Sequence, residues 1–478
     1  MTTNKHKPAM AKASAVAMTL AVAMALGGCA LSAPPARVDA AAPPQWQAPL
    51  PHNGNLTDLN NWWRNQGDPL LVQLIDAAQA ASPTLASARS RIAQSRAERV
   101  AAGAALAPSL DLAGSVARQN QQSSIPTGTT SQAALQASWE IDLFGAGRAA
   151  RNAAEARFNS ANAGWHEARV SVAAETANQY YGLRACEQLL KVAVQDAGSR
   201  AYTARLTELS SKAGFLSPSD SALARASAAD GRSRASAQRA ACDIGVKSLV
   251  ALTAIAEPDL RARLGAATAV PAPAIAIAAL PAQTLSQRPD VYTAEQEVAA
   301  ASFEVRGAQA QRYPRLSLSG SVGAANFRSG GENTQLDTWT LGPLAISVPL
   351  FDAGRRRANA DAAQARYELA VSQYRGSVRK AVAEVEQALV TLNSTGERAS
   401  DAEISLQGYR TAFTAIEDRY KNGLASLLEL EDARRSRLAA ENNVVSLQQE
   451  RSNAWVALYR AAGGGWTAEA TVPAQANN

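Results

Sequence analysis

Two very long stretches without proline limit what this chain can fold into. Residues 147–213 and 354–422 lack proline and are rich in Ala, Arg, Glu and Gln, which tolerate helices well. At ~1.5 Å per residue, the first stretch predicts a helix of about 100 Å. Helices of such length are normally coiled coils. A glycine follows each stretch and a shorter helical segment returns, so we expect helical hairpins over about 147–252 and 354–460.

The two halves of the chain repeat one plan at a nearly constant offset. Residues 110–116 read Leu-Asp-Leu-Ala-Gly-Ser-Val, and residues 316–322, 206 positions later, read Leu-Ser-Leu-Ser-Gly-Ser-Val. The segment from Phe144 to Arg148 matches the segment from Phe351 to Arg355 at an offset of 207. This period is too long for a solenoid repeat. We therefore interpret the chain as one structural unit used twice.

Each unit contains two segments with the periodicity of a strand. Apolar and polar residues alternate strictly from Ala133 to Leu143, which predicts a strand with one apolar face. An 11-residue strand is long enough to cross a membrane when tilted, and Trp139 and Trp339 fit interfacial anchors. The alternative is a soluble sheet half covered by helices. The predicted strands cover about residues 109–118, 132–143, 315–326 and 338–350.

Four strands per chain have a consequence for assembly. The smallest membrane barrels have about eight strands, and exposed strand edges are not tolerated in lipid. Membrane strands in this chain would have to close with strands of other copies. The strand count therefore predicts an oligomer.

Composition argues against several other functions. The 478 residues carry a formal net charge of +6, but without the three lysines of residues 1–28 it falls to +3, so no basic face for nucleic acid is indicated. The three cysteines and three histidines lie far apart without C-x-x-C or H-E-x-x-H spacing, so no metal site is predicted. No cofactor loop is recognisable, and neither His52 nor His166 accompanies a nucleophile motif. We predict no catalytic residue and no cofactor.

The N-terminus reads as an export signal with a lipid anchor. Lysines precede a run of about 14 small apolar residues, which is too short to span a bilayer. The run ends Leu-Gly-Gly-Cys, with Cys29 last, and this resembles a bacterial lipobox. We expect cleavage before Cys29 and covalent lipid on it, the alternative being an ordinary signal followed by a chance cysteine. Multiple acyl chains would hold the mature N-terminus at a membrane.

These patterns predict six segments. They are a signal peptide over 1–28, a lipidated tether over 29–65, a first repeat over 66–265, a Pro/Ala-rich linker over 266–281, a second repeat over 282–466 and a tail over 467–478.

Two cysteines lie at equal distances from the first predicted turn. Cys186 and Cys242 have residue 214 as their midpoint, so an antiparallel hairpin centred there sets them opposite each other. In an oxidising periplasm such a pair forms a disulfide if its Cα atoms lie within about 7 Å. The alternative is two free cysteines in an alanine-rich interface. We predict the disulfide.

Taken together, these features resemble one family. The lipobox, the duplicated unit, the run from Leu350 to Arg355 and the C-terminal run from Leu458 to Trp466 closely resemble TolC-like outer-membrane efflux factors. More narrowly, the chain is similar to the NodT-type lipoproteins of resistance–nodulation–division pumps. The resemblance covers about residues 56–466.

The resemblance implies a fold and partners. The expected fold is mainly α with a membrane β-barrel: a homotrimer whose 12-stranded outer-membrane barrel continues into a helical periplasmic tunnel. The expected function is export of small toxic compounds or drugs, together with a periplasmic adaptor protein and an inner-membrane pump. A passive diffusion porin and an adaptor lipoprotein are the alternatives. The substrate is not readable from the sequence.

The resemblance also implies functional residues at the hairpin ends. Docking to the adaptor is expected at the turns, which contain Gly214, Phe215, Leu216, Gly423 and Leu424. An ordinary hairpin end with an apolar residue closing the last turn is the alternative.

A periplasmic gate is expected beside these turns. Glu429 and Asp432 share one helix face and match the family's acidic pair, while Tyr420 and Asp220 match its gate tyrosine and acidic partner. Three chains would gather six carboxylates around one axis, which favours cations. Ala425 stands where the family has its gate arginine, so the resemblance implies either a weaker latch or one that uses Arg434 or Arg435 instead. A solvated charged face of a coiled coil is the alternative.

Overall fold

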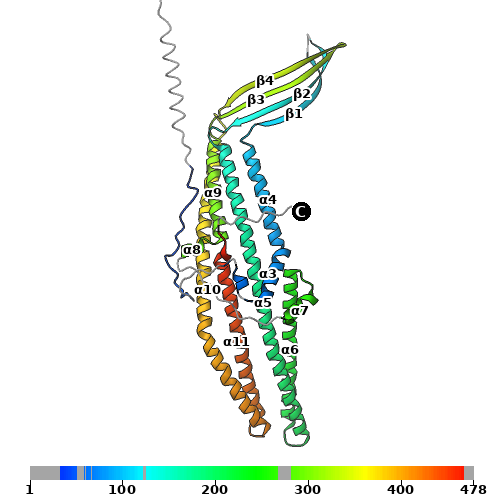
Figure 1. Ribbon diagram of the computed structural model, residues 1–478, viewed down its shortest axis with the longest axis vertical. Helices are drawn as coiled ribbons and strands as arrows, with labels where there is room; N and C mark the ends of the chain where they lie inside the picture. Colours follow the sequence, from blue (N-terminus) through cyan, green and yellow to red (C-terminus); the bar gives the residue numbers. More distant parts are fainter. Residues whose placement is uncertain are drawn as a thin grey trace, which may run out of the picture. The chain divides into compact units, whose positions relative to one another are not determined.

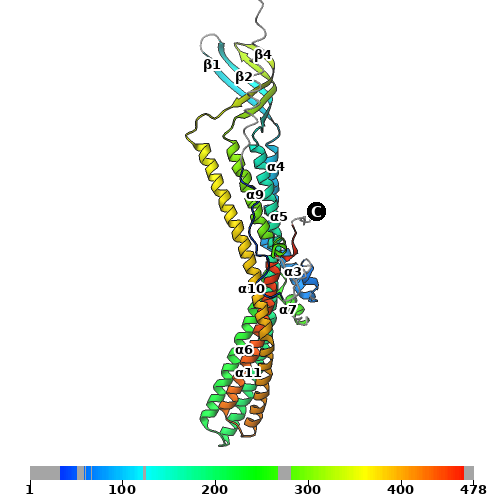
Figure 2. The same cartoon turned by 90° about the vertical axis from the view of Figure 1, so that its left-hand side faces the viewer.

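The computed structural model describes residues 33–50, 59, 61–65, 67–121, 125–266 and 281–467 (Figures 1 and 2). Its helices are α2 (Trp62–Asn65), α3 (Pro69–Ala81), α4 (Pro83–Ala104), α5 (Ala146–Lys212), α6 (Pro218–Thr253), α7 (Glu257–Ala266), α8 (Pro281–Leu285), α9 (Pro289–Ala310), α10 (Arg355–Lys421), α11 (Leu427–Ala461) and the 3-10 helix η1 (Gly463–Gly465). Its strands are β1 (Ser109–Gln121), β2 (Ile125–Ile141), β3 (Arg315–Ser329) and β4 (Glu332–Ser347). The predicted signal peptide, Cys29 and almost all of the predicted linker and tail lie outside the described residues.

The chain forms two compact units. Of the described residues, those within 33–38, 94–159 and 295–372 form the first unit, and those within 39–93, 160–294 and 373–467 form the second. The two 67-residue helices, α5 and α10, contribute residues to both units. Their length agrees with the absence of proline in these stretches.

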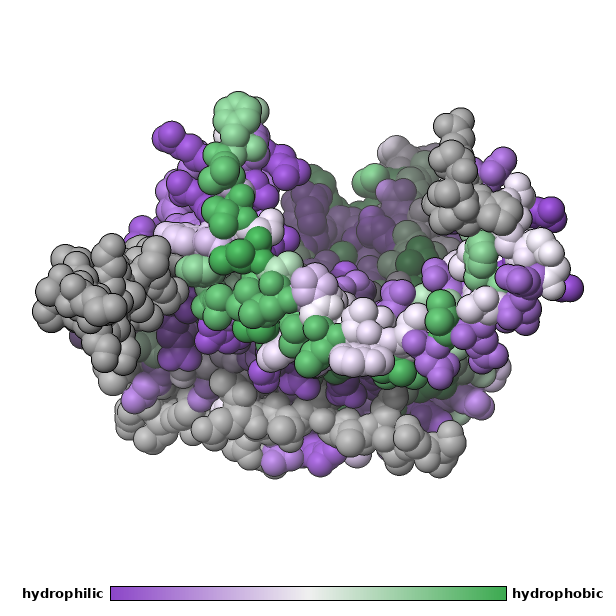
Figure 3. All heavy atoms as spheres, turned by 90° about the horizontal axis from the view of Figure 1, so that it is seen from above, coloured by the Kyte–Doolittle hydropathy of each residue, from purple (hydrophilic) through white to green (hydrophobic). Residues whose placement is uncertain are grey.

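The strands of the first unit form one antiparallel sheet in the order β1-β2-β3-β4. Leu112 pairs with Leu135, and Leu135 pairs with Val322, so the apolar residues of neighbouring strands share one face. The strands extend further towards their turns than predicted, because most of the polar residues between the predicted pairs of strands continue the ladders. At the opposite ends, residues 142–143 and 348–350 were predicted as strand but lie outside β2 and β4. Apolar residues gather in bands beside polar ones in the view from above (Figure 3).

A β-bulge keeps the apolar face continuous along β4. Leu318 of β3 pairs with Leu344, but Gly320, two residues later, pairs with Leu341 three residues away. The extra residue in β4 reverses the alternation at that point. In a regular strand, Leu341 and Leu344, which are three residues apart, would point to opposite faces.

Small residues let the helices of the first unit approach closely. Ala153 and Ala156 of α5 pack against Ala300 of α9 in a buried cluster. Next to it, the guanidinium of Arg157 forms an ion pair with Glu304. Alanine pays little side-chain entropy in a helix, so this stripe suits two long helices in contact.

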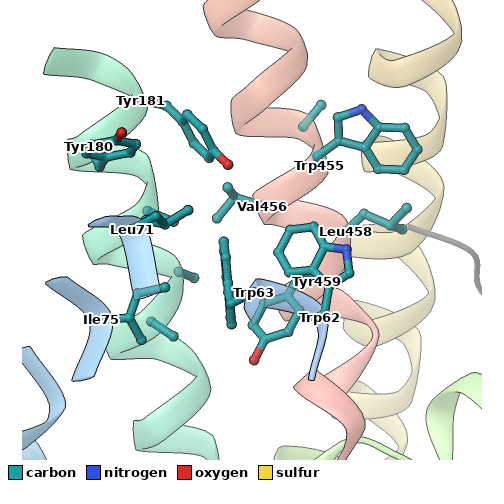
Figure 4. Packing of buried hydrophobic residues seen from close by; sticks show 14 of the residues in the cluster. Trp62, Trp63, Leu71, Ile75, Tyr180, Tyr181, Trp455, Val456, Leu458 and Tyr459 are labelled. Carbon is teal, nitrogen blue, oxygen red and sulfur yellow. The ribbon is translucent and has the colours of Figure 1, made fainter. Parts of the chain in front are cut away.

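The second unit contains the largest apolar core. The stacked rings of Trp62 and Tyr459 have centroids 5.0 Å apart, and Trp63 meets Tyr459 edge-on at 4.8 Å (Figure 4). Leu71 of α3 and Val456 of α11 belong to the same buried cluster. The short helices α2 and α3, which the repeat pattern did not predict, thus cover the long ones with aromatic and aliphatic side chains.

Part of the predicted tether is held against α10. The backbone N–H groups of Gln47 and Ala48 donate to the carboxylate of Glu386 at 2.6 and 2.8 Å. Trp46 beside them is buried. Residues 46–48 are therefore packed chain rather than free linker.

None of the helices in the described ranges is long and apolar enough to cross a bilayer.

Candidate functional site at the ends of the helical hairpins

The first hairpin ends in a glycine turn with an exposed aromatic residue. Gly214 has φ +82°, and the N–H of Phe215 donates to the carbonyl of Ser210 at 2.9 Å, which is a Schellman motif. A hydrophobic contact between the residue after the glycine and the last helical turn frequently accompanies this motif. Of the two positions within reach, Ser210 is polar and Leu209 is 56% exposed. Phe215 itself is 84% exposed, whereas Leu216 is half-buried.

The second hairpin ends in the same way. Gly423 has φ +73°, and the N–H of Leu424 donates to the carbonyl of Arg419 at 2.8 Å. Leu424 is 68% exposed. Both predicted turn glycines therefore have the left-handed backbone that a glycine turn requires, and both turns present an apolar side chain to solvent.

The two returning helices begin with matching caps. Ser217 caps α6 by accepting from the N–H of Asp220 at 3.1 Å, and Ser426 caps α11 by accepting from the N–H of Glu429 at 3.2 Å. Asp220 and Glu429 thus occupy the same position, three residues into each helix. This correspondence was not predicted, although the Ser-x-x-Glu pattern that begins at Ser426 is a readable capping box.

The predicted gate carboxylates lie on the exposed face of α11. Both Glu429 and Asp432 are exposed. The carboxylate of Glu429 accepts from the N–H of Ser426 at 2.7 Å. This backbone bond, with the Ser426 hydroxyl, lowers the pKa of Glu429 below its usual value. Asp432 forms an exposed ion pair with Arg435 at 3.1 Å.

The structure does not bring Tyr420 and Asp220 together within one chain. The hydroxyl of Tyr420 hydrogen-bonds to that of Thr207 at 3.0 Å, while the carboxylate of Asp220 accepts from the hydroxyl of Ser217 at 2.8 Å. Each group bonds to a different hydroxyl instead: Tyr420 to one on the neighbouring helix α5, and Asp220 to the serine that caps its own helix. A Tyr420–Asp220 latch therefore has no counterpart inside the described chain.

Arg434 is not available as a substitute for the missing gate arginine. Its side chain is 0% exposed and forms an ion pair with Glu431. It also donates to the hydroxyls of Ser199 at 3.1 Å and Thr203 at 2.9 Å. Arg434 thus binds the second hairpin to α5 of the first.

A second arginine completes this buried network. Arg200 of α5 donates to Asp196 at 2.8 Å, to the hydroxyl of Ser227 of α6 at 2.5 Å and to Glu431 of α11. Gly231 lies where a Cβ would be 2.9 Å from the Arg200 side chain, so the close approach requires glycine. We call Asp196, Arg200, Glu431 and Arg434 the buried charge network.

The sulfur atoms of Cys186 and Cys242 form a disulfide in the structure, with Cα atoms 5.6 Å apart. The side-chain amide of Gln238 donates to the backbone carbonyl of Cys186 at 3.4 Å. The link joins α5 to α6 far from the turn at Gly214.

Comparisons with known proteins place the chain in a family. The family profile described as outer membrane efflux protein matches residues 74–254 and 280–464. Pyoverdine export outer membrane protein OpmQ of Pseudomonas putida is 31% identical over 464 residues, covering 94% of this chain and 97% of that protein. Nodulation protein T of Rhizobium leguminosarum bv. trifolii is 26% identical over 450 residues, covering 89% and 93%.

Solved structures of outer-membrane channels have a similar fold. The outer-membrane channel OprN is similar with a TM-score of 0.81 and 26% identity, covering 91% of this chain and all of that one. The Campylobacter jejuni CmeC outer membrane channel also has a TM-score of 0.81, at 22% identity, covering 93% of this chain and 96% of that one, and supports the fold alone. The resemblance to TolC-like efflux factors is thus confirmed: the chain belongs to the outer membrane efflux protein family.

Proposed function

We propose that this protein is the outer-membrane channel of a tripartite efflux pump, carrying small toxic compounds from the periplasm to the exterior. One observation carries the proposal: the same chain combines an apolar-faced sheet with two 67-residue helices that end in exposed apolar turns. Relatives are named for export of pyoverdine and for solvent efflux. The test is a deletion strain complemented with the gene, with dye accumulation measured with and without the cognate pump. Accumulation unaffected by the pump would support a passive porin instead.

The working form is a homotrimer. The sheet has two edges, β1 and β4, that pair with no further strand among the described residues. Unpaired backbone groups are costly in lipid, so edges of neighbouring copies would pair, and three copies would close a barrel of 12 strands. Cross-linking between cysteines introduced at Val116 and Leu336, on the two edge strands, should yield covalent trimers. Products no larger than dimers would contradict the closed ring.

The exposed turns dock the periplasmic adaptor. Covering an exposed apolar side chain with a partner is favourable, and Phe215 and Leu424 are both mostly exposed at equivalent positions of the two turns. Phe215→Asp with Leu424→Asp should leave trimers intact while abolishing efflux and adaptor cross-linking. The matched control, Ser219→Asp with Asn422→Asp, adds the same charge to the same turns and should retain both.

The carboxylates of Glu429 and Asp432 give the periplasmic entrance its preference for cations. Three chains would gather six of them, and the lowered pKa keeps Glu429 charged. Glu429→Gln with Asp432→Asn should reduce cation preference in single-channel recordings. As a matched control, Asp401→Asn with Glu403→Gln removes two exposed acids of α10 and should leave the cation preference unchanged. Whether Tyr420 and Asp220 latch across two copies stays a prediction, tested by conductance of Tyr420→Phe with Asp220→Ala.

Lipid on Cys29 holds the mature N-terminus at the membrane. The proposal rests on the lipobox of the sequence. Mass spectrometry of the exported protein should find a cleaved and acylated Cys29, and Cys29→Ser should reduce localisation more than assembly. An intact signal peptide or an unmodified cysteine would refute it.

A further inference from the structure

Arginines concentrate at one end of the sheet in the first unit. The segments 142–151, 306–315 and 351–357 contain eight arginines, no lysine and only two carboxylates, a net charge of +6. Residues 29–478 have a net charge of +3, so the residues of this range outside the three segments have a negative net charge. We call these eight residues the arginine belt: Arg148, Arg151, Arg306, Arg312, Arg315, Arg355, Arg356 and Arg357.

The three segments are brought together by the fold. They connect β2 to α5, α9 to β3 and β4 to α10 (Figure 1). The rings of Phe144 and Tyr313 stack 5.0 Å apart, which joins the first two segments. The start of β3 pairs with the end of β4, with Arg315 opposite Ser347, which brings in the third.

The two carboxylates are already engaged. Asp142 accepts from the backbone N–H groups of Gly147 and Arg148 at 3.1 and 2.9 Å. Asp352 accepts from the N–H of Gly354 at 3.1 Å and from the guanidinium of Arg356 at 2.8 Å. Both aspartates therefore cap the starts of long helices and neutralise at most their adjacent arginines.

Five of the eight belt arginines form no ion pair within the described ranges. No side-chain hydrogen bond or ion pair there engages the exposed guanidinium groups of Arg151, Arg306, Arg312, Arg315 and Arg355. The NH2 atoms of Arg148 and Arg306 even converge on Gly145, where a Cβ would lie 3.6 and 3.8 Å from them. Like charges this close repel each other, so an anionic partner would stabilise the belt.

Apolar side chains begin where the belt ends. Leu350 and Phe351 are 92% and 90% exposed, and they stand five and four residues before Arg355 in sequence. Leu143, two residues before Gly145, is about half exposed. A surface with bare apolar groups beside unpaired arginines matches the boundary between the acyl chains and the phosphates of a membrane.

We propose that the arginine belt binds the headgroups of anionic phospholipids at the membrane face next to the helices. Guanidinium groups bind phosphate oxygens in a bidentate manner, which suits this headgroup. The opposite end of the sheet is different: segments 118–128 and 326–335 contain two arginines and one glutamate. The belt thus gives the sheet one lipid-selective end. This inference rests on the proposed insertion of the sheet in the outer membrane.

The test measures lipid binding by the full-length protein in detergent. Native mass spectrometry would compare phosphatidylglycerol with phosphatidylcholine, with inorganic phosphate added in a separate arm. Arg306→Gln, Arg312→Gln and Arg355→Gln together should weaken phosphatidylglycerol binding roughly 100-fold, at about fivefold per arginine. The matched control replaces three exposed arginines of α6, Arg225→Gln, Arg232→Gln and Arg239→Gln, and should bind phosphatidylglycerol as the parent protein does.

Each other outcome overturns the proposal. Equal binding of both lipids, or an equal loss in the α6 control, means that the belt does not select anionic lipid. Displacement of phosphatidylglycerol by millimolar phosphate means that the belt binds a free anion instead. A protein that forms conducting channels in bilayers without lipid preference refutes only this inference, whereas one that does not insert at all refutes the proposed function.

Discussion

The two helical hairpins end alike but are held in different ways. In each, a glycine with positive φ ends a 67-residue helix, and a serine caps the helix that returns. The first hairpin, α5–α6, has the Cys186–Cys242 cross-link between its helices. The second hairpin, α10–α11, contains no cysteine.

The second hairpin instead depends on polar bonds to the first. Arg434 of α11 reaches two hydroxyls of α5, and Arg200 of α5 reaches Glu431 of α11. Apolar contacts such as those of Leu427 and Leu430 permit several rotations of a helix, but directional bonds to a buried guanidinium permit few. A disulfide thus joins the two helices of the first hairpin, whereas buried ion pairs and hydrogen bonds fix the rotation of α11 in the second.

The largest expected effect comes from removing the buried guanidinium. Arg434→Ala leaves the buried charge network with two carboxylates and one guanidinium, that of Arg200, and should cost about 3–5 kcal/mol because one buried negative charge is then uncompensated. Amide hydrogen exchange in the detergent-solubilised protein should show faster exchange in α11. Arg435→Ala, next along the helix, removes only an exposed pair with Asp432 and should cost about 0–1 kcal/mol. Equal effects of the two changes would contradict the role of the network.

Removing the covalent brace should have the next largest effect. Cys186→Ala with Cys242→Ala should destabilise the first hairpin by about 2–4 kcal/mol, because the open chain gains conformational freedom when unfolded. Hydrogen exchange should rise in α6 and stay unchanged in α10. Thiol labelling of the denatured, unreduced parent protein should find neither cysteine reactive. Two reactive thiols would show that the brace is absent in the exported protein.

Lowering the pH should destabilise the first repeat and leave the stability of α10 unchanged. Burial, and secondarily the charge of Arg169, lowers the pKa of His166 in α5 from 6.5 to about 4. The unfolded chain then binds the proton more tightly. The stabilisation from neutral His166 is therefore full above about pH 6.5 and is lost as the pH falls towards 4, by up to about 3 kcal/mol.

His166→Phe should flatten that dependence between pH 7 and 4, measured as thermal unfolding of the solubilised protein. His166→Gln is the matched polar control. An unchanged pH profile in both variants would assign the acid response to other groups.

The smallest expected difference lies in the caps. Glu429 accepts from the backbone N–H of Ser426, whereas Asp220 has only the hydroxyl of Ser217 as its cap contact. Glu429→Ala should therefore destabilise the start of its helix more than Asp220→Ala does, because it removes a bond to a backbone N–H. Exchange rates of the first-turn amides of α6 and α11 would rank the two. A larger increase in exchange from Asp220→Ala than from Glu429→Ala would contradict the stronger cap of α11.

The sequence predicts well those features that a few neighbouring residues determine, and less well those that depend on distant contacts. The lengths of α5 and α10 and the turns at Gly214 and Gly423 follow from proline and glycine placement, which acts within a few residues. The capping box at Ser426 was equally local and readable. The ends of β2 and β4 were not predicted well, because Thr, Ser and Gln serve loops and strands alike, and pairing with neighbouring strands decided the outcome.

The buried charge network could not have been predicted. In sequence, Arg434 stands in an ordinary charged run with Arg435, and nothing local tells which of the two is buried. Its partners Ser199 and Thr203 lie more than 230 residues away. The choice follows from the rotation of α11 against α5, which only the assembled hairpins define.

The bulge in β4 makes this strand sensitive to changes in chain length. Its extra residue absorbs one position, so Trp339 and Leu344, five residues apart, share a face. Deleting Gly342 would remove the bulge and leave the faces unchanged, whereas deleting one residue such as Thr340 would exchange the faces of the residues between it and the turn. Single deletions in related chains should therefore collect in the turn and at the bulge, and avoid residues 333–340.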